Sequence, residues 1–446
     1  MKLINKTLFI PKIFLALLLT FCLAHVQAQT EELAVDSALA KLPDVKVISK
    51  FVSYSPYRLE YQLAVKQPID HTNPSIGYFY QQVHLIHRGF NKPMVMETEG
   101  YGGRNSGNEI EKMLHCNDLN IEFRYFNKSK PDSLLWQYLT FEQATADLHH
   151  INQLFHQLYS NKWISTGISR GGETTLIYRY FYPDDVTASV PYVAPMPNDI
   201  EDKRVYTFQD TAGGAETVKK IKHFQLFLLQ HEAQALQKVP VWETKLHYTT
   251  VGGMGAAFEY AILEFPFAFW QITEYTGKDI PTGDNLDDYI ALLMGTFENE
   301  EIANFSDENA VDGYLPHAYM TYQMGYYKYR LAPFKGYLHY LSGENPTAAF
   351  LPASVPRKAY DPGFELKVTT WLANKGNNIL YIYGGRDTWS ACKMVYGNQV
   401  NAKTFIVPGA NHYMARVKHM SPQMQQDFAA SLESMTGLKA DVSVLK

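Results

Sequence analysis

The sequence predicts an α/β fold in which two separate parts of the chain build one mostly parallel sheet. Strand-like and helix-like segments alternate up to residue 196, helical segments dominate 197–365, and the alternation returns at 366–446. Such alternation is typical of parallel sheets, because parallel strands need long crossover connections that helices supply. We therefore expect one α/β domain at 29–196 and 366–446, interrupted by a mostly helical insertion at 197–365.

The first part of this pattern opens with runs that are rich in β-branched and aromatic residues and that end at turn residues. We expect strands in 58–65, 77–86, 93–99 and 120–126. The third run is followed by GYGGRNSG, a glycine-rich turn.

A helix is expected after residue 140, followed by a strand–helix–strand unit. Thr140 and Gln143 form the T-x-x-Q signature of a helix N-terminus. Apolar residues then recur at helical spacing: Ala144, Leu148, Ile151, Phe155 and Leu158. KWISTGIS predicts a strand, GGETTLIYRYFY predicts a helix that Pro183 stops, and ASVPYVAP predicts the next strand.

After the insertion, the α/β pattern is resumed. NNILYIYGGRD at 377–387 and TFIVPGANH at 404–412 each predict a buried strand that ends in a turn, and 422–435 predicts a closing helix. The insertion itself is rich in aromatic residues, as in FEYAILEFPFAFWQITEY at 258–275.

The N-terminus predicts export. Lysines precede an apolar run of about twelve residues, and VQA before residue 29 resembles a signal-peptidase site, so we expect residues 1–28 to be removed. The run is shorter than the ~20 residues that a membrane span needs. We expect a soluble periplasmic or secreted protein with no membrane partner, in which Cys116 and Cys392 remain and their pairing is open. A net charge of −5 argues against nucleic acid as a partner.

The segment GISRG at 167–171 carries the first chemical signal. Ser169 lies between a predicted strand and a predicted helix, with a glycine two residues away on each side. A turn this tight admits only small residues, and it presents the hydroxyl at the positive end of the helix. The motif alone fits an ordinary turn equally well, but the strand and helix on the required sides favour a nucleophile elbow.

Partners for such a serine follow in the chain order Ser, Asp, His. Asp387 and His412 each follow a predicted strand, and the loop of Asp387 contains no second carboxylate. His412 would take the serine proton during attack, and Asp387 would orient the imidazole. A capping aspartate and a surface histidine are the alternatives for these two residues, and His419 is a rival base.

An oxyanion hole requires two aimed hydrogen-bond donors. The backbone N–H of Arg170, next after the serine, is the first candidate. The second is expected in the turn after the strand at 93–99, around Tyr101 or Gly102.

Long blocks of the chain resemble a known family. TGISRGGETTLIYRYFYPDDVTASVPYVAP, QPIDHTNPSIGYFYQQV, METEGYGG, GGRD and GANH are similar, in the same order, to secreted serine peptidases of family thirty-seven, and more distantly to the lysosomal Pro-X carboxypeptidase group. The resemblance implies an α/β-hydrolase fold with a helical cap and a triad of Ser169, Asp387 and His412. It also implies release of tripeptides from free N-termini, often after proline. Arg170 stands where the family implies lysine.

Substrate selection is expected to come from the insertion. A buried ammonium group requires a counter-charge, and the candidate acids are Glu259 and Glu264 in the cap and Glu99 beside the oxyanion turn. A solvated helical acid is the alternative for each. Gln323 stands where the resemblance implies an acid that binds the substrate's amino group.

Two other functions share parts of this pattern. An esterase or lipase would use the same triad under a different cap, and a hydrolase fold without activity could serve as a binding protein. We expect no metal and no organic cofactor. Oligomeric state, the preferred residue before the scissile bond and the physiological substrate are left open by the sequence.

Overall fold

The computed structural model describes residues 29–445 apart from 55–56, 106, 239–252, 298–307, 342–350 and 352–353. The predicted signal peptide at 1–28 therefore lies outside the described residues. Among the described helices, none combines the length and the apolar character that a membrane span needs. Cys116 and Cys392 are both buried and both unpaired.

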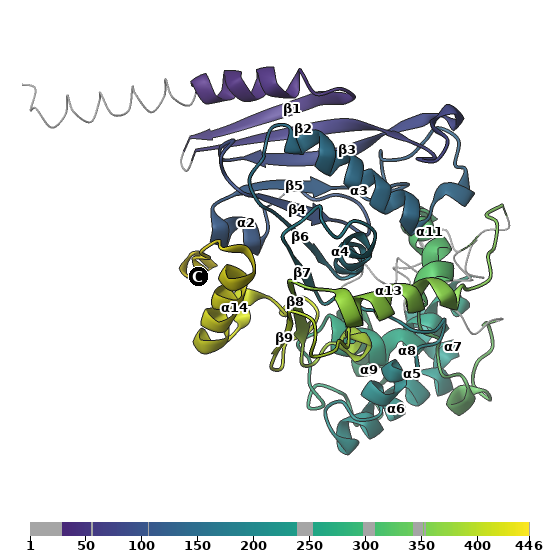
Figure 1. The fold of residues 1–446 in the computed structure, drawn as a ribbon. Coiled ribbons are helices and arrows are strands. Elements are labelled where there is room, and N and C mark those ends of the chain that lie inside the picture. The colour runs from purple at the N-terminus through teal and green to yellow at the C-terminus, as the bar shows by residue number, and fades with distance from the viewer. Residues whose placement is uncertain are drawn as a thin grey trace, which may run out of the picture.

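A nine-stranded sheet forms the centre of the molecule, in the order β1-β2-β3-β5-β4-β6-β7-β8-β9 (Figure 1). Its strands are β1 (Val45–Tyr54), β2 (Tyr57–Pro68), β3 (Tyr78–His87), β4 (Met94–Thr98), β5 (Asn117–Ile121), β6 (Trp163–Ile168), β7 (Ala188–Tyr192), β8 (Ile379–Gly384) and β9 (Ala402–Val407). The pairs from β1 to β5 are antiparallel, and all pairs from β5 through β9 are parallel. The structure thus has the α/β-hydrolase fold that the resemblance implies.

Helices cover both faces of the parallel strands, and this explains why β4, β7 and β8 are buried along their whole length. One face packs against α3 (Phe141–His156), α4 (Arg170–Phe181) and α13 (Pro362–Lys375), and the other against α2 (Glu109–Leu114) and α14 (Pro422–Thr436). In Figure 1 these two groups of helices lie on opposite sides of the sheet.

The chain between β7 and β8 is helical and has its own aromatic core. Its helices are α5 (Lys203–Gln209), α6 (Ala215–Gln230), α7 (Glu232–Lys238), α8 (Met254–Gln271), α9 (Leu286–Thr296) and α11 (Glu308–Met324). Figure 1 shows α5 to α9 grouped beside β8 and β9. The core of this group includes Phe224, Phe265 and Tyr289, whose rings stack.

One predicted strand lies earlier in the chain than expected. The sequence predicts a strand over 120–126, but β5 begins at Asn117 and ends at Ile121. Beyond that point, tertiary contacts override the local β propensity. Phe123 N–H donates to the Tyr101 carbonyl at 3.0 Å, and the buried Arg124 pairs with Asp147 at 2.7 Å.

Candidate active site

Ser169 occupies a strained turn between β6 and α4. Its φ is 58° and its ψ is −125°, a positive-φ conformation outside the left-handed helical region that non-glycine residues rarely adopt. The glycines around it are required by space. A Cβ at Gly167 would lie 2.3 Å from the Gly171 carbonyl oxygen, and one at Gly171 would lie 2.5 Å from the Thr98 carbonyl oxygen. This is the nucleophile-elbow geometry predicted for GISRG. The Ser169 side chain makes no capping bond to α4.

Asp387 and His412 form a buried pair. Asp387 follows β8, where it caps the short 3-10 helix Thr388–Cys392, and it is completely buried. His412 follows β9 and is 4% exposed. Its Nδ1–H donates to Asp387 Oδ2 at 2.9 Å. In the neutral imidazole this bond selects the tautomer with the proton on Nδ1, which leaves Nε2 as the nitrogen that can act as a general base.

Strand pairing places the serine and this pair at one edge of the sheet. Ile168, just before Ser169, pairs with Tyr192 of β7, and Tyr192 pairs with Ile382 of β8. Gly384, where β8 ends, pairs with Val407 of β9. Because these strands are parallel and adjacent, the loops after β6, β8 and β9 all leave the same edge.

The rival base His419 lies in different surroundings. It is exposed, ends the 3-10 helix Val417–His419, and bonds through Nδ1 to the Met414 carbonyl at 2.8 Å. The carboxylate of Asp387 pairs with His412 instead. The geometry therefore favours His412 as the base.

The turn after β4 lies directly against the first residue of α4. A Cβ at Gly100 would fall 2.5 Å from the Arg170 side chain and 2.8 Å from its carbonyl carbon. Tyr101 and Gly102 are thereby held beside the elbow. The N–H of Arg170 belongs to the first turn of a helix and has no acceptor within that helix. Both predicted sources of oxyanion donors therefore meet at the elbow.

The Arg170 side chain is buried under the helical region. Its guanidinium lies 5.0 Å from the ring centroid of Phe123 and 5.5 Å from that of Tyr101. Nη1–H donates to Nδ1 of His317 on α11 at 2.8 Å. Burial, together with the neighbouring guanidinium, lowers the pKa of His317 well below its usual value, so the imidazole is neutral and can accept this bond. Sequence reasoning missed His317, a single histidine in an aromatic stretch.

Two of the predicted substrate residues have structural partners. Glu259 accepts backbone N–H groups from His339, Tyr340 and Leu341, the last at 2.8 Å. Gln323 accepts the N–H of Phe141 at 2.9 Å and donates to Glu142 at 2.9 Å, so its amide holds the first turn of α3.

Glu99 and Glu264 have other surroundings. Glu99 accepts from Arg104 and from Asn120, each at 2.8 Å, and burial raises its pKa to about 7. Glu264 is 7% exposed, and its two oxygens lie 2.8 and 2.7 Å from the hydroxyl of Tyr327.

Aromatic rings connect Glu264 to the loop of Asp387. Phe267 stacks on Tyr327 with a centroid distance of 4.2 Å, and the rings of Tyr326 and Tyr327 each lie 5.6 Å from that of Trp389. Trp389 donates its backbone N–H to Asp387 Oδ1 at 3.2 Å. The carboxylate of Glu264 therefore belongs to an aromatic wall that reaches the loop of Asp387.

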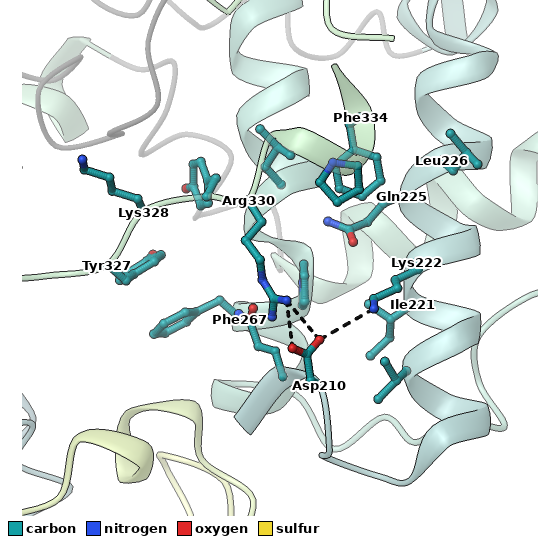
Figure 2. A pocket seen from close by; sticks show the side chains of 16 residues that line it. Asp210, Ile221, Lys222, Gln225, Leu226, Phe267, Tyr327, Lys328, Arg330 and Phe334 are labelled. Carbon is teal, nitrogen blue, oxygen red and sulfur yellow. Dashed lines mark hydrogen bonds and ion pairs between the residues drawn. The ribbon is translucent and has the colours of Figure 1, made fainter. Parts of the chain in front are cut away.

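Phe267 and Tyr327 also line a cavity of about 200 Å³ within the helical region (Figure 2). Figure 2 shows the Arg330 guanidinium beside Asp210, with Lys222 on the other side of that carboxylate. The distances are 2.9 Å from Arg330 and 3.6 Å from Lys222. The cation of Arg330 is thus neutralised by a residue of the same cavity.

The fold and this constellation define an α/β hydrolase with a serine at the elbow. The chain belongs to the peptidase S37 family: the model described as PS-10 peptidase S37 matches residues 28–443. A relative, the prolyl tri/tetrapeptidyl aminopeptidase of Streptomyces mobaraensis, is 28% identical over 388 residues, which cover 84% of this chain and 79% of the relative. The protein is therefore a serine peptidase.

Solved structures with a similar fold are more distant. A proline iminopeptidase of Mycobacterium smegmatis is 12% identical, with a TM-score of 0.40, and the match covers 84% of this chain and 98% of that one. An α/β fold family hydrolase of Bacillus anthracis is 15% identical, with a TM-score of 0.33, and the match covers 84% of this chain and 98% of that one.

Proposed function

We propose that this protein is an exported serine peptidase that releases tripeptides or similarly short peptides from free N-termini, with a preference for cleavage after proline. The observation that carries the catalytic part is the 2.9 Å bond between His412 and Asp387 at the sheet edge that also bears the strained Ser169. The name of the Streptomyces relative supports the substrate class.

The chemistry follows from the roles of the three residues. Ser169 Oγ attacks the scissile carbonyl carbon while His412 Nε2 takes the hydroxyl proton, and Asp387 stabilises the imidazolium that forms. His412 then gives the proton to the leaving amine, the C–N bond breaks, and an acyl-enzyme remains. A water molecule, deprotonated by His412, then attacks the ester carbon, and His412 returns the proton to Ser169 Oγ as the C–O bond breaks. The N–H groups of Arg170 and of Tyr101 or Gly102 stabilise the oxyanion.

The helical region at 197–365 is proposed as a cap over the site. A roofed site accepts only a short N-terminal segment, and a carboxylate in the roof pairs with the substrate ammonium. Among the predicted acids, Glu264 suits this role best, because its partners are tyrosines of the aromatic wall. The carboxylate of Glu259 is instead engaged by three backbone N–H groups.

A panel of chromogenic substrates tests this proposal. Free-amine tripeptidyl anilides with proline before the scissile bond should be cleaved faster than aminoacyl anilides and fatty-acid esters. Faster cleavage of the fatty esters would make the enzyme an esterase. Labelling by a fluorophosphonate, blocked in Ser169→Ala, separates both enzymes from an inactive binding protein.

Export is proposed from the leader at 1–28 alone. N-terminal sequencing of the protein recovered outside the cytoplasm should begin at Gln29. An unprocessed N-terminus would contradict it.

A further inference from the structure

A second cavity, of about 390 Å³, lies beside the segments that carry Ser169 and His412, on the side of the sheet with α2 and α14. Ile168 and Tyr413 both line it. They are the chain neighbours of Ser169 and His412, so the cavity adjoins the elbow and the histidine loop together. Its other lining residues come from strands β4, β6 and β7, from the turn before α2 and α2 itself, from the segment after His412, and from the C-terminal 3-10 helix Val442–Leu445.

The cavity is cationic. Arg104, Lys112, Arg416 and Lys418 line it, against two carboxylates, Glu97 and Glu109. Both carboxylates are engaged by the protein. Arg104 donates to Glu97 at 2.7 Å and to Glu99 at 2.8 Å, so its charge is compensated. The two oxygens of Glu109 accept the N–H groups of Val417 and Lys418 at 2.8 and 2.9 Å. Lys112, Arg416 and Lys418 therefore leave an excess of positive charge at the cavity, against the one carboxylate of Glu109.

Arg416 is the cation of this group best placed to act on a ligand. Its Nη1 donates to the carbonyls of His412 and Ala415, each at 3.0 Å, so the guanidinium is held against the histidine loop. Among the described residues, Arg416 forms no ion pair and no hydrogen bond beyond these two. Its guanidinium lies 5.6 Å from the ring centroid of Tyr192, which also lines the cavity, and the charge of Glu109 acts on it. A guanidinium fixed in this way is preorganised for a carboxylate, which it can bind through two parallel hydrogen bonds.

We propose that this cavity binds the leaving part of the substrate and that Arg416 binds its C-terminal carboxylate. The inference rests on the proposed function. The histidine that protonates the leaving amine must touch it, so the leaving peptide starts beside His412 and extends into the space next to that loop. A cavity of about 390 Å³ is near the small end of ligand pockets, which suits one or two amino-acid residues. The preferred substrates are therefore short oligopeptides that end soon after the scissile bond.

The test compares a proline-containing tetrapeptide with a free C-terminal carboxylate against its C-terminal amide. Both carry a free N-terminus and the same scissile bond. For the wild-type enzyme we expect kcat/KM to be roughly tenfold to a hundredfold higher for the acid, the range that a charge-assisted hydrogen bond supports. The difference should lie mainly in KM, because the carboxylate is remote from the reacting atoms.

Variants of Arg416 locate the effect. Arg416→Gln should bring the ratio of acid to amide close to one, and Arg416→Lys should retain part of it. The ratio is the readout because the loss of Arg416 also loosens the loop of His412, which lowers the rate on both substrates. Arg330→Gln, an arginine of the other cavity, is the matched control and should keep the wild-type ratio.

The outcomes separate this inference from the proposed function. Equal cleavage of acid and amide by the wild-type enzyme overturns the inference and leaves the proposed function standing. An unchanged ratio in Arg416→Gln also overturns it, because the carboxylate is then bound elsewhere. If neither tetrapeptide is cleaved while a fatty ester is, the proposed function itself fails.

Discussion

Arg170 and His317, which are 147 residues apart in the chain, are joined by a buried hydrogen bond of 2.8 Å between Nη1 and Nδ1. The ring of His317 also lies 5.4 Å from that of Tyr101. One residue of α11 therefore touches both segments that are proposed to supply the oxyanion hole. Docking of the helical region and the shape of the oxyanion hole are linked through this histidine.

Replacement of His317 tests that link. His317→Phe keeps an aromatic ring but removes the acceptor for Arg170, so kcat should fall about tenfold or more on peptides, less than the 10²–10³ for loss of a whole oxyanion donor. Hydrolysis of a small acetate ester, whose binding does not depend on the helical cap, should slow by a similar factor. His317→Asn offers an acceptor oxygen and should restore part of the rate. If only the peptide KM changes, His317 acts on substrate binding instead.

The nucleophile is tested by Ser169→Ala. We expect kcat to fall by roughly 10⁴-fold to 10⁶-fold, because the three residues act as a unit. The melting temperature should not fall, because the substitution removes no contact of the core. The conformation of the elbow backbone depends on the neighbouring glycines, which are unchanged. Steady-state kinetics and a thermal melt measure both quantities. A variant with more than about a tenth of wild-type activity would remove Ser169 from the mechanism.

The two histidines after β9 should differ sharply. His412→Ala removes the partner of Asp387 and should abolish peptidase activity. His419→Ala removes an exposed side chain that bonds only to the Met414 carbonyl, and most activity should remain. The same peptide assay on both variants decides between them. If His419→Ala lost peptidase activity and His412→Ala retained it, His419 would be the general base.

Glu173, buried in the first turn of α4, should make stability depend on pH. Burial raises its pKa from 4.5 to about 8, although Arg170 opposes the shift. The folded chain keeps a proton that the unfolded chain releases, so the contribution of Glu173 to stability is complete below about pH 4.5 and is lost as the pH rises to about 8.

Glu173→Gln cannot ionise and should escape this loss. Its melting temperature should match the wild type near pH 5 and exceed it by roughly 2–4 °C at about pH 8.5. The exposed Glu433→Gln serves as the control and should show no such difference. A Gln variant that melts lower than the wild type at the higher pH would show that the ionised carboxylate is stabilising.

The local chemistry of the elbow could be read from the sequence, because its strand, turn and helix each carry a nearby signal. The helix start at Thr140 is one example, because Thr140 Oγ1 accepts the Gln143 N–H at 3.2 Å. The Gln143 side chain bonds to His71 N–H and to Asp70 instead of completing the capping box. The outermost strand of the sheet was harder to predict. β1 was not expected, because its partly exposed face, with Ile48 and Phe51, lacks the pattern of a half-buried strand.

Side-chain pairing across long separations could not be predicted. The bond between Arg170 and His317 depends on how the helical region docks, and no local pattern encodes it. The partners of Glu259 and Gln323 could not be predicted either. From the sequence, these two residues were only an acid and an amide that were candidates for substrate binding. Arg416 lies four residues after His412, but its position next to the cavity is evident only from the structure.

Recognition of the substrate's N-terminus gives the last prediction, and α8 offers a matched pair of residues for it. Acetylation removes the ammonium charge and adds bulk where a roofed site should end. A charge pair in a partly desolvated site contributes ~1.5–3 kcal/mol to the binding free energy. We therefore expect kcat/KM for an N-acetylated peptide to be at least about tenfold lower than for the same peptide with a free amine. Glu264→Gln should shrink this advantage, whereas Glu259→Gln should lower stability and leave it intact, because Glu259 is occupied by backbone N–H groups. Equal cleavage of blocked and free peptides by the wild-type enzyme would show an open site, and the protein would then be an endopeptidase.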